Sequence, residues 1–461
     1  MTGVKKNSGE LYERLRREVG KIKLVDAHEH LPSEEQWLAR KLDRTSLLGY
    51  VQLSQETDFS SLLGYAHGDL VSAGMPKEAI LPGMSGEEKW KRVRPFWRYV
   101  RNTGAGSHCR RVLSTFFDVD DLSDSTLPII QEGLDKLRRP GIYQRLLKEQ
   151  YNFAVCVNVV DPVTETSSSE LFAPLLYTSN FAAVQTRSDI ERLGDAANQE
   201  IYSLQTYLRA LDTVLEQGFR NGLVGIKWHR LAYLRDINYS TGDAHAAEKC
   251  LDRIFRMPAR GGIASNTPVG FDEMRPFQDF IQHYLVQRAI DLDLPIQIHT
   301  GTLGGSHGAQ VSHTNPIHLV DLFLRYPQAR FDLLHASYPY MREVTALVKL
   351  FPNVYINTAW FEILSPRAAG QYLREWVTTI PTNKIFAFGG DHKNIFFPCI
   401  CAEVVRDNLS EILADEVSEG DMSEEDALDI ASSMLRENAW EYFRLQDRWA
   451  NRHERPATIN S

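Results

Sequence analysis

The chain has 461 residues, of which 43% are hydrophobic and 24% are charged, and its formal net charge is −9. This composition is typical of a globular protein, and the acidic balance does not favour nucleic acid or an anionic membrane as a partner. No run of about 18 apolar residues occurs, so the sequence predicts no membrane-spanning helix. The first ten residues lack the apolar core of a signal peptide.

Five cysteines are scattered along the chain. An odd number of widely spaced cysteines in a long chain does not suggest a disulfide framework, so we expect free thiols and a reducing, cytoplasmic location. Cys399 and Cys401 lie close together, but there is no second cysteine pair that could complete a metal site with them.

Eight short runs rich in apolar and β-branched residues predict strands, and amphipathic stretches long enough for helices lie between most of them. The predicted strands are Ile22–Ala27, Phe153–Val159, Ala182–Gln185, Leu223–Lys227, Pro295–His299, Arg330–Leu334, Val354–Asn357 and Ile385–Phe388. The clearest predicted helices are Gln199–Gln217, Phe277–Leu292, Pro316–Tyr326, Met341–Leu350 and Ala368–Ile380.

Strands that alternate with helices pair in parallel through right-handed crossovers. Eight such units predict an α/β fold, a closed (β/α)8 TIM barrel. A doubly wound open sheet is the alternative, but no Gly-x-Gly-x-x-Gly motif follows the first strand.

We assign residues 20–30 and 152–445 to the barrel, and residues 31–151 to a mostly helical insertion after the first strand. The insertion follows the end of a strand at which barrel active sites form, so we expect it to be a lid or a pocket wall. The alternative is a helical subdomain without ligand contacts. Ser423 precedes an acidic helical turn and is a predicted helix cap. Residues 446–461 are expected to be a C-terminal tail.

The most informative motif is the pair His28 and His30 near the start of the chain. Side chains two residues apart on a strand point to the same face, so both imidazoles would leave the end of the first strand together. One short segment could then bind a divalent metal. The motif His-x-His is short enough to arise by chance, and its weight depends on the residues at the other strand ends.

Polar residues follow most of the later predicted strands, where a barrel places its catalytic groups. Each alone has an ordinary structural explanation, such as a buried histidine or a turn carboxylate. Together they would converge on one end of the barrel. They are Arg187 after the third strand, Lys227, His229 and Arg230 at the fourth, His299 at the fifth, His335 and Tyr338 after the sixth, Trp360 after the seventh and Asp391 after the eighth.

The order His-x-His, His, His, Asp on strands one, five, six and eight resembles the amidohydrolase superfamily of metal-dependent barrels. The sequence motifs are most similar to those of its amidohydrolase-related (amidohydrolase 2-like) branch. The long insertion is instead similar in length and place to that of uronate isomerase, another member of the superfamily. The segments that carry the resemblance to the branch are Val25–Leu31, Gly225–Lys227, Gln297–Gly301, Leu333–Pro339, Phe351–Tyr355, Gly389–Asp391 and Ala427–Phe443.

The resemblance implies a divalent metal, with zinc favoured and manganese or iron as alternatives, and it leaves one or two ions open. The implied ligands are His28, His30, His299 and Asp391. Asp391 would also accept a proton from water and pass it to the leaving group. His335 would polarise a carbonyl or ligate a second metal. Lys227 would bind substrate or, if carbamylated, bridge two metals.

Cationic and hydrogen-bonding side chains suggest a small acidic or polyhydroxylated substrate, since arginine matches carboxylates geometrically. The implied substrate-binding residues are Arg187, His229, Arg230, Tyr338 and Trp360.

Three hypotheses follow. The first is a metal-dependent hydrolase of an amide, lactone or related C–N or C–O bond. The second is an aldose–ketose isomerase of the uronate isomerase type. The third is a catalytically silent barrel that serves as a binding module. The expected partner is a small-molecule substrate, and a homo-oligomer is compatible with the sequence.

Overall fold

The computed structural model describes residues 2–39, 56–81, 83–161, 163–164, 166–256, 268–304 and 310–453. The chain divides into two compact units. Unit 1 comprises Met1–Cys156, Leu303–His307 and Thr358–Ala439, and unit 2 comprises Val157–Thr302, Gly308–Asn357 and Trp440–Ser461. Within the described residues, no helix combines the length and the hydropathy that a membrane span requires. All five cysteines are buried and free, as expected.

The described strands form one eight-stranded sheet whose order follows the sequence, as the (β/α)8 TIM barrel requires. The strands are β1 (Leu24–Glu29), β2 (Phe153–Val160), β3 (Phe172–Tyr177), β4 (Gly225–Trp228), β5 (Ile296–Ile298), β6 (Phe331–Leu333), β7 (Val354–Asn357) and β8 (Ile385–Phe386). Within unit 2 the pairing is parallel, and Lys227 of β4 stands opposite Gln297 of β5, which stands opposite Asp332 of β6. The predicted fold class is confirmed, and seven of the strands lie within two residues of their predicted ends.

The predicted third strand, Ala182–Gln185, is wrong. Ala182 ends the short helix α8 (Ser179–Ala182), and the third strand is β3, ten residues earlier. β3 contains Pro174, which has no backbone N–H and usually argues against a strand interior. Here the Pro174 carbonyl oxygen accepts a hydrogen bond from the Val224 N–H at 2.9 Å, so proline serves the sheet as an acceptor.

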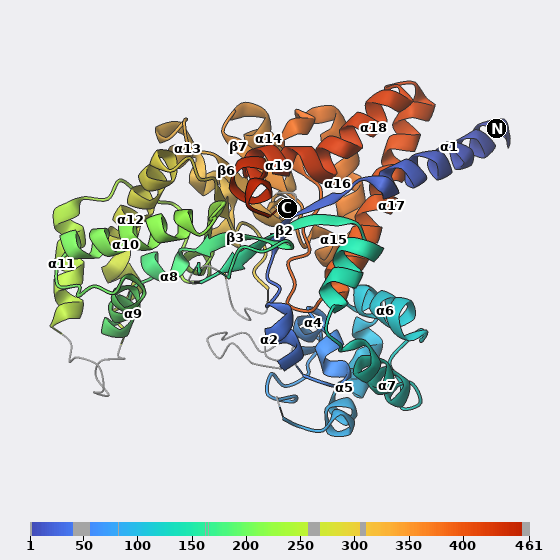
Figure 1. Cartoon of the computed structure of the whole chain (residues 1–461), viewed down its shortest axis with the longest axis horizontal. Coiled ribbons are helices and arrows are strands. Elements are labelled where there is room, and N and C mark those ends of the chain that lie inside the picture. The colour runs from blue at the N-terminus through green and yellow to red at the C-terminus, as the bar shows by residue number, and fades with distance from the viewer. Residues whose placement is uncertain are drawn as a thin grey trace, which may run out of the picture. The chain divides into compact units, whose positions relative to one another are not determined.

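The described residues between β1 and β2 form helices and turns but no strand (Figure 1). They lie in unit 1. Ser85 and Glu88 form a capping box at the start of α5, a typical helix-start signal. The elements are α2 (Glu34–Ala39), η1 (Phe59–Leu62), α4 (Ala66–Ser72), α5 (Gly86–Val100), α6 (Gly104–Phe117), α7 (Leu127–Leu137) and η2 (Gln144–Gln150).

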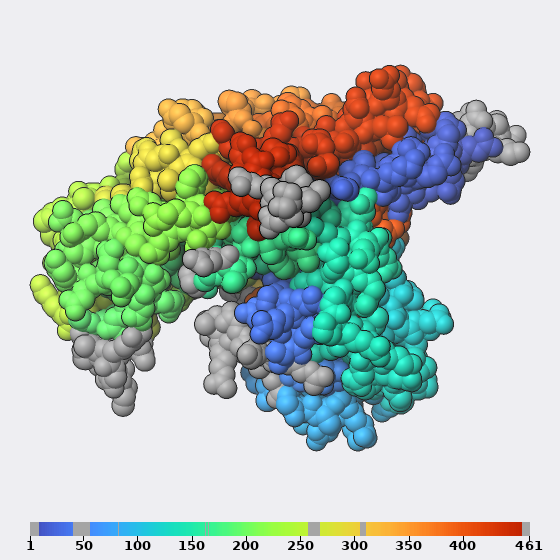
Figure 2. Space-filling view, in the orientation of Figure 1, coloured from blue at the N-terminus to red at the C-terminus, as the bar shows by residue number. Residues whose placement is uncertain are grey.

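The N-terminal helix α1 (Thr2–Lys21) packs against the C-terminal helices of unit 1 (Figures 1 and 2). Arg16 pairs with Asp407 of α17 (Phe396–Glu419) at 2.6 Å, and Arg14 pairs with Glu424 of α18 (Glu424–Ser432) at 3.0 Å. The Ser423 cap of α18 is confirmed. The remaining helices of this part are α15 (Phe361–Leu364), α16 (Pro366–Thr379), η8 (Thr382–Lys384), η9 (Ser433–Glu437) and α19 (Asn438–Tyr442).

Unit 2 places α9 to α12 side by side (Figure 1). α12 begins six residues before the predicted Phe277, because Pro276 is accommodated inside the helix. Predicted helix Met341–Leu350 is found with the same bounds. The elements are α9 (Arg187–Ala197), α10 (Leu204–Arg220), η3 (Arg230–Tyr233), α11 (Ala244–Phe255), α12 (Phe271–Asp291), η5 (Val311–Thr314), η6 (Pro316–Leu319), α13 (Val320–Arg325), η7 (Leu334–Ser337), α14 (Met341–Leu350), η10 (Gln446–Ala450) and α20 (Asn451–His453).

The segment predicted as a tail from residue 446 remains helical to His453. Trp449 is 1% exposed, and its indole N–H donates to the Ser169 carbonyl oxygen at 2.7 Å. The aromatic side chain anchors this segment, so a tail could begin only after His453. Residues 454–461 lie outside the described residues.

Candidate metal centre and strand-end residues

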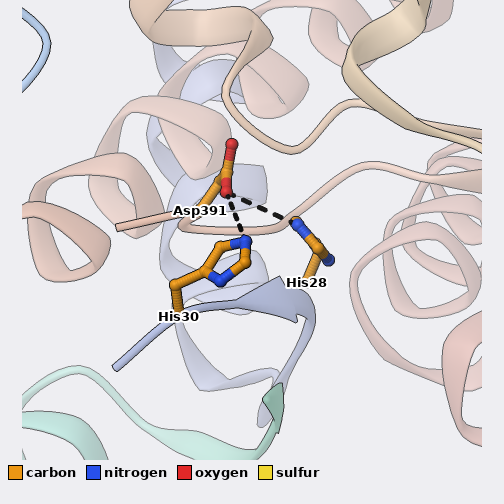
Figure 3. Close-up of side chains that lie close together, drawn as sticks. All are labelled: His28, His30 and Asp391. Atoms are coloured by element: carbon orange, nitrogen blue, oxygen red, sulfur yellow. Dashed lines mark ion pairs between the residues drawn. The ribbon is translucent and has the colours of Figure 1, made fainter. Parts of the chain in front are cut away.

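Three of the predicted ligands converge in unit 1. His28 lies within β1, His30 follows it by two residues, and Asp391 lies in the turn after β8 (Figure 3). The Nε2 atoms of both histidines lie 3.4 Å from Asp391 Oδ1. The two imidazole rings are perpendicular, with centroids 4.9 Å apart. Both imidazoles therefore face the same carboxylate oxygen. His28 and Asp391 are buried, and His30 is half-buried.

The backbone presents Asp391 in an unusual conformation. Its φ is 50°, and its N–H donates to the His28 carbonyl oxygen at 3.0 Å, which ties the turn to β1. The two residues before Asp391 are both glycine, because the turn passes close to other atoms. A Cβ at Gly389 would lie 2.5 Å from the Ala359 Cβ, and one at Gly390 would lie 2.1 Å from Glu29 Oε2.

Two further carboxyl groups of β1, Asp26 and Glu29, are fully buried behind the ligands. Burial raises the pKa of both carboxyl groups above their usual range. The charge of Asp26 raises the pKa of Glu29 further, whereas a hydrogen bond with Glu29 lowers the pKa of Asp26. Backbone N–H donors act in the opposite direction by stabilising the ionised forms.

The insertion contributes Tyr65 to this centre. Its hydroxyl lies 2.7 Å from the Asp391 carbonyl oxygen and 3.2 Å from Oδ2, the oxygen that does not face the histidines. Trp360, a predicted substrate-binding residue, packs against the Tyr65 ring, with the centroids 4.6 Å apart and the rings tilted by 34°. No motif marked Tyr65 in the sequence, since it lies in a region without strand periodicity.

His392, next to Asp391, does not join the candidate ligands. Its ring stacks on Phe397 with centroids 3.9 Å apart, and burial lowers its pKa to about 3. It is therefore a neutral, packed side chain at neutral pH.

In unit 2, the structure gathers three of the predicted histidines into one cluster. His299 Nδ1 lies 3.0 Å from His335 Nε2, and its Nε2 lies 3.0 Å from the Thr302 carbonyl oxygen. The ring of His229 lies 4.6 Å from that of His299. Burial and the neighbouring His335, His229 and Lys227 lower the pKa of His299 well below its usual value. His299 is therefore neutral, the form that binds metals.

His335 is held by a strained turn. His335, Ala336 and Ser337 all have positive φ values, of 63°, 51° and 54°. Such a run of non-glycine residues is energetically costly and persists only where the surroundings impose it. Gly301 packs against this turn, and a Cβ there would lie 2.2 Å from the Tyr338 carbonyl oxygen.

Lys227 is 1% exposed in the barrel strand β4. Asp332, whose Oδ2 accepts a hydrogen bond from Gln297 Nε2 at 2.7 Å, has its pKa raised by burial to about 7, and the Lys227 charge opposes that shift. The lysine therefore belongs to a buried polar layer of β4, β5 and β6.

The predicted position of Arg187 at the end of the third strand is wrong, because β3 ends at Tyr177 and Arg187 begins α9. Its guanidinium donates to the Phe255 carbonyl oxygen at 3.0 Å and pairs with Glu191. Arg230 is half-buried at the start of η3. The Tyr338 carbonyl oxygen accepts a hydrogen bond from the Thr302 N–H at 2.6 Å.

The three converging side chains fit a divalent cation. Two imidazoles and one carboxylate offer ligand atoms that all lie within 4.8 Å of one another. This donor set suits zinc and also manganese or iron.

Comparison with known proteins finds similar sequences and structures. The amidohydrolase family model matches residues 241–439. Protein fluG from Emericella nidulans is 33% identical over 157 residues, which are 33% of this chain and 18% of fluG. The chain thus spans less than a fifth of that relative.

Two other matches extend over nearly the whole chain. Uronate isomerase from Thermotoga neapolitana is 22% identical over 440 residues, which cover 88% of this chain and 91% of that enzyme. The crystal structure of uronate isomerase from Thermotoga maritima superposes with a TM-score of 0.74 at 18% identity, covering 94% and 97% of the two chains. At this identity the superposition shows a common fold. The chain is thus similar to the amidohydrolase family over residues 241–439, and to uronate isomerases over nearly its whole length.

Proposed function

We propose that the chain is a metal-dependent enzyme that interconverts the aldose and ketose forms of a small acidic sugar of the uronate type. The observation that carries the proposal is the contact between Tyr65, in the helical insertion, and the carboxylate of Asp391. The likeness to uronate isomerases covers this insertion as well as the barrel, which supports an isomerase over other activities of the superfamily.

His28, His30 and Asp391 would hold the cation, since their donor atoms already converge. A divalent cation at this position would polarise a carbonyl or hydroxyl oxygen of the substrate. His299 as a further ligand is a prediction from the resemblance, and its neutral, buried imidazole is compatible with that role.

Asp391 is the proposed proton carrier. Its Oδ1 faces the two imidazoles, whereas its Oδ2 faces the Tyr65 hydroxyl at 3.2 Å. In an aldose–ketose conversion, one base removes a proton from the carbon next to the carbonyl and returns it to the former carbonyl carbon. We place this proton on Oδ2, and the Tyr65 hydroxyl would hold that oxygen in position.

The insertion would serve as a pocket wall, because the Tyr65 hydroxyl contacts Asp391 and its ring packs against Trp360. Trp360 remains a proposed substrate-binding residue of unit 1, and His229 and Arg230 remain proposed substrate-binding residues of unit 2. Lys227, His335 and Tyr338 remain proposed site residues of unit 2. The predicted substrate-binding role of Arg187 is less well supported, because its guanidinium contacts α9 and the end of α11.

A hydrolase is the second candidate. The amidohydrolase model matches residues 241–439, and this segment includes His335 on its strained turn beside His299. In that case Asp391 would accept a proton from the attacking water and pass it to the leaving group, and His335 would donate a hydrogen bond to the scissile carbonyl.

Incubation of the purified, zinc- or manganese-loaded protein with a series of uronates tests the proposal, with ketose formation as the readout. Turnover that is lost in Asp391→Asn is the expected result. Hydrolysis of amides or lactones without ketose formation would replace the isomerase with the hydrolase. Absence of both activities, together with the absence of bound metal, would instead favour a binding module.

A further inference from the structure

A pair of buried carboxyl groups in β1 lies behind the candidate metal centre, and the backbone contacts of each follow the same pattern. Asp26 Oδ1 accepts the His28 N–H at 3.1 Å and the Gly390 N–H at 3.2 Å. The first donor belongs to a candidate ligand on β1. The second belongs to the residue directly before Asp391. One carboxyl group therefore connects the two segments that carry the ligands.

Glu29 makes the same kind of contact with backbone N–H groups two residues further along both segments. Its Oε1 accepts the His30 N–H at 2.7 Å and the His392 N–H at 2.5 Å. His30 is a candidate ligand, and His392 directly follows Asp391. Because four backbone N–H groups around the three ligands end on two carboxyl groups, β1 and the turn after β8 are held in register on both sides of the site.

The close approach at Gly390 shows how little room the arrangement leaves. A Cβ at this position would lie 2.1 Å from Glu29 Oε2 and 3.2 Å from Asp26 Oδ2. Both side chains are fully buried. A residue larger than glycine would displace the Glu29 carboxyl group from the turn.

We propose that Asp26 and Glu29 are positioning residues for the metal centre, which preset the spacing of its ligands before a cation binds. The inference rests on the proposed function, since it presumes a cation at His28, His30 and Asp391. Groups that orient metal ligands without touching the metal typically change its affinity by about 10- to 100-fold when they are removed.

Three substitutions in the full-length protein test the inference, with Zn²⁺ as the probe and a competing chromophoric chelator to measure affinity. Glu29→Met removes the acceptor while keeping the length of the side chain. Glu29→Gln keeps an amide oxygen that can accept both N–H groups. Glu362→Met is the matched control, because Glu362 is a buried glutamate of unit 1 on α15.

We expect Glu29→Met to weaken zinc binding by about 10-fold or more, and Glu29→Gln and Glu362→Met to stay within about threefold of the wild type. The thermal unfolding temperature of the metal-free proteins separates a positioning role from a general loss of folding. Equal affinity in Glu29→Met and wild type would overturn the inference, as would a loss in Glu29→Gln as large as that in Glu29→Met.

Gly390→Ala provides a second test if Glu29→Met does not fold. The added methyl group should displace the Glu29 carboxyl and weaken zinc binding, whereas Gly370→Ala should not, because a Cβ at Gly370 meets no atom within 4 Å. Unchanged affinity in Gly390→Ala would overturn the inference. A wild-type protein that binds no zinc would overturn the proposed function itself. Zinc affinity that is the same in the wild type and in these variants would overturn only the positioning role.

Discussion

The Tyr65 hydroxyl lies 2.7 Å from the carbonyl oxygen of Asp391 and 3.2 Å from its Oδ2, although 326 residues separate the two. Tyr65 belongs to the helical insertion after β1, and Asp391 lies in the turn after β8. The insertion thus supplies a polar group to the carboxylate that also faces both histidines of the candidate metal centre.

Removing the Tyr65 hydroxyl should lower activity while leaving the metal in place. A hydrogen bond to a charged group contributes about 1.5–3 kcal/mol, so Tyr65→Phe should lower kcat by roughly 10- to 100-fold. Steady-state kinetics and metal analysis of the same preparation provide the measurement. Tyr202→Phe is the control, since Tyr202 is 69% exposed. Unchanged kcat in Tyr65→Phe would remove Tyr65 from the proton-transfer step.

Replacing His299 tests the ligand that rests on resemblance. If His299 binds the cation, His299→Ala should weaken zinc binding by about 10-fold or more. His245→Ala, an exposed position on α11, should bind zinc as the wild type does. If His299→Ala also retains full affinity, the cation is held without this histidine, and the role of His299 has to be sought in the cluster with His335.

The turn that holds His335 should be sensitive to a single methyl group at Gly301. Gly301 and Gly141 both have positive φ values, of 75° and 86°. A Cβ at Gly141 meets no atom within 4 Å, whereas one at Gly301 would lie 2.2 Å from the Tyr338 carbonyl oxygen. Gly141→Ala should therefore cost about 1 kcal/mol of unfolding free energy, which is the backbone strain alone.

Gly301→Ala should cost about 3 kcal/mol, because backbone atoms of the turn must move as well. Urea unfolding of both variants measures the two free energies. Equal losses would show that the turn adapts to the methyl group without cost and that its contact with Gly301 contributes little to the position of His335.

The stability of unit 1 should fall in acid through His108 of α6. Burial lowers the pKa of His108 to about 4, and the nearby Arg111 acts in the same direction. In the unfolded chain a histidine has a pKa of about 6.5, so between these values the unfolded state binds the extra proton. Stability contributed by the neutral histidine is thus complete above about pH 6.5 and is lost progressively as the pH falls towards 4.

Replacement of His108 by Asn should reduce the slope of unfolding free energy against pH in this window. The expected reduction corresponds to the uptake of about one proton on unfolding. Urea unfolding at a series of pH values between these limits measures the slope. His245→Asn, at an exposed site, should leave the slope unchanged. The prediction fails if the two variants have the same slope.

The sequence predicted those parts of the molecule that follow from local periodicity or from spacing along one strand. The alternation of short apolar runs with amphipathic stretches indicated the barrel, and His28, His30 and Asp391 were placed together because the ends of barrel strands meet. β3 was missed because Pro174 interrupts the pattern of a strand, and the argument for Arg187 failed with it.

Contacts between distant segments left no signal in the sequence. Tyr65 lies in an insertion whose helical pattern says nothing about which side chain meets Asp391. Glu29 occupies the middle position of the His-x-His motif and no sequence pattern marks it, yet its carboxyl group accepts the backbone N–H of His392. Such roles depend on three-dimensional packing, and local patterns of hydrophobicity do not encode them.

Metal analysis of the protein after reconstitution with Zn²⁺ tests whether His28, His30 and Asp391 bind a cation, with the double variant His28→Ala/His30→Ala and Asp391→Asn measured in parallel. We predict a stoichiometric amount of zinc in the wild type and its loss in the double variant, with weakened binding in Asp391→Asn. A wild type without stoichiometric zinc, or a double variant that retains it, would contradict the assignment of these three residues as the metal centre.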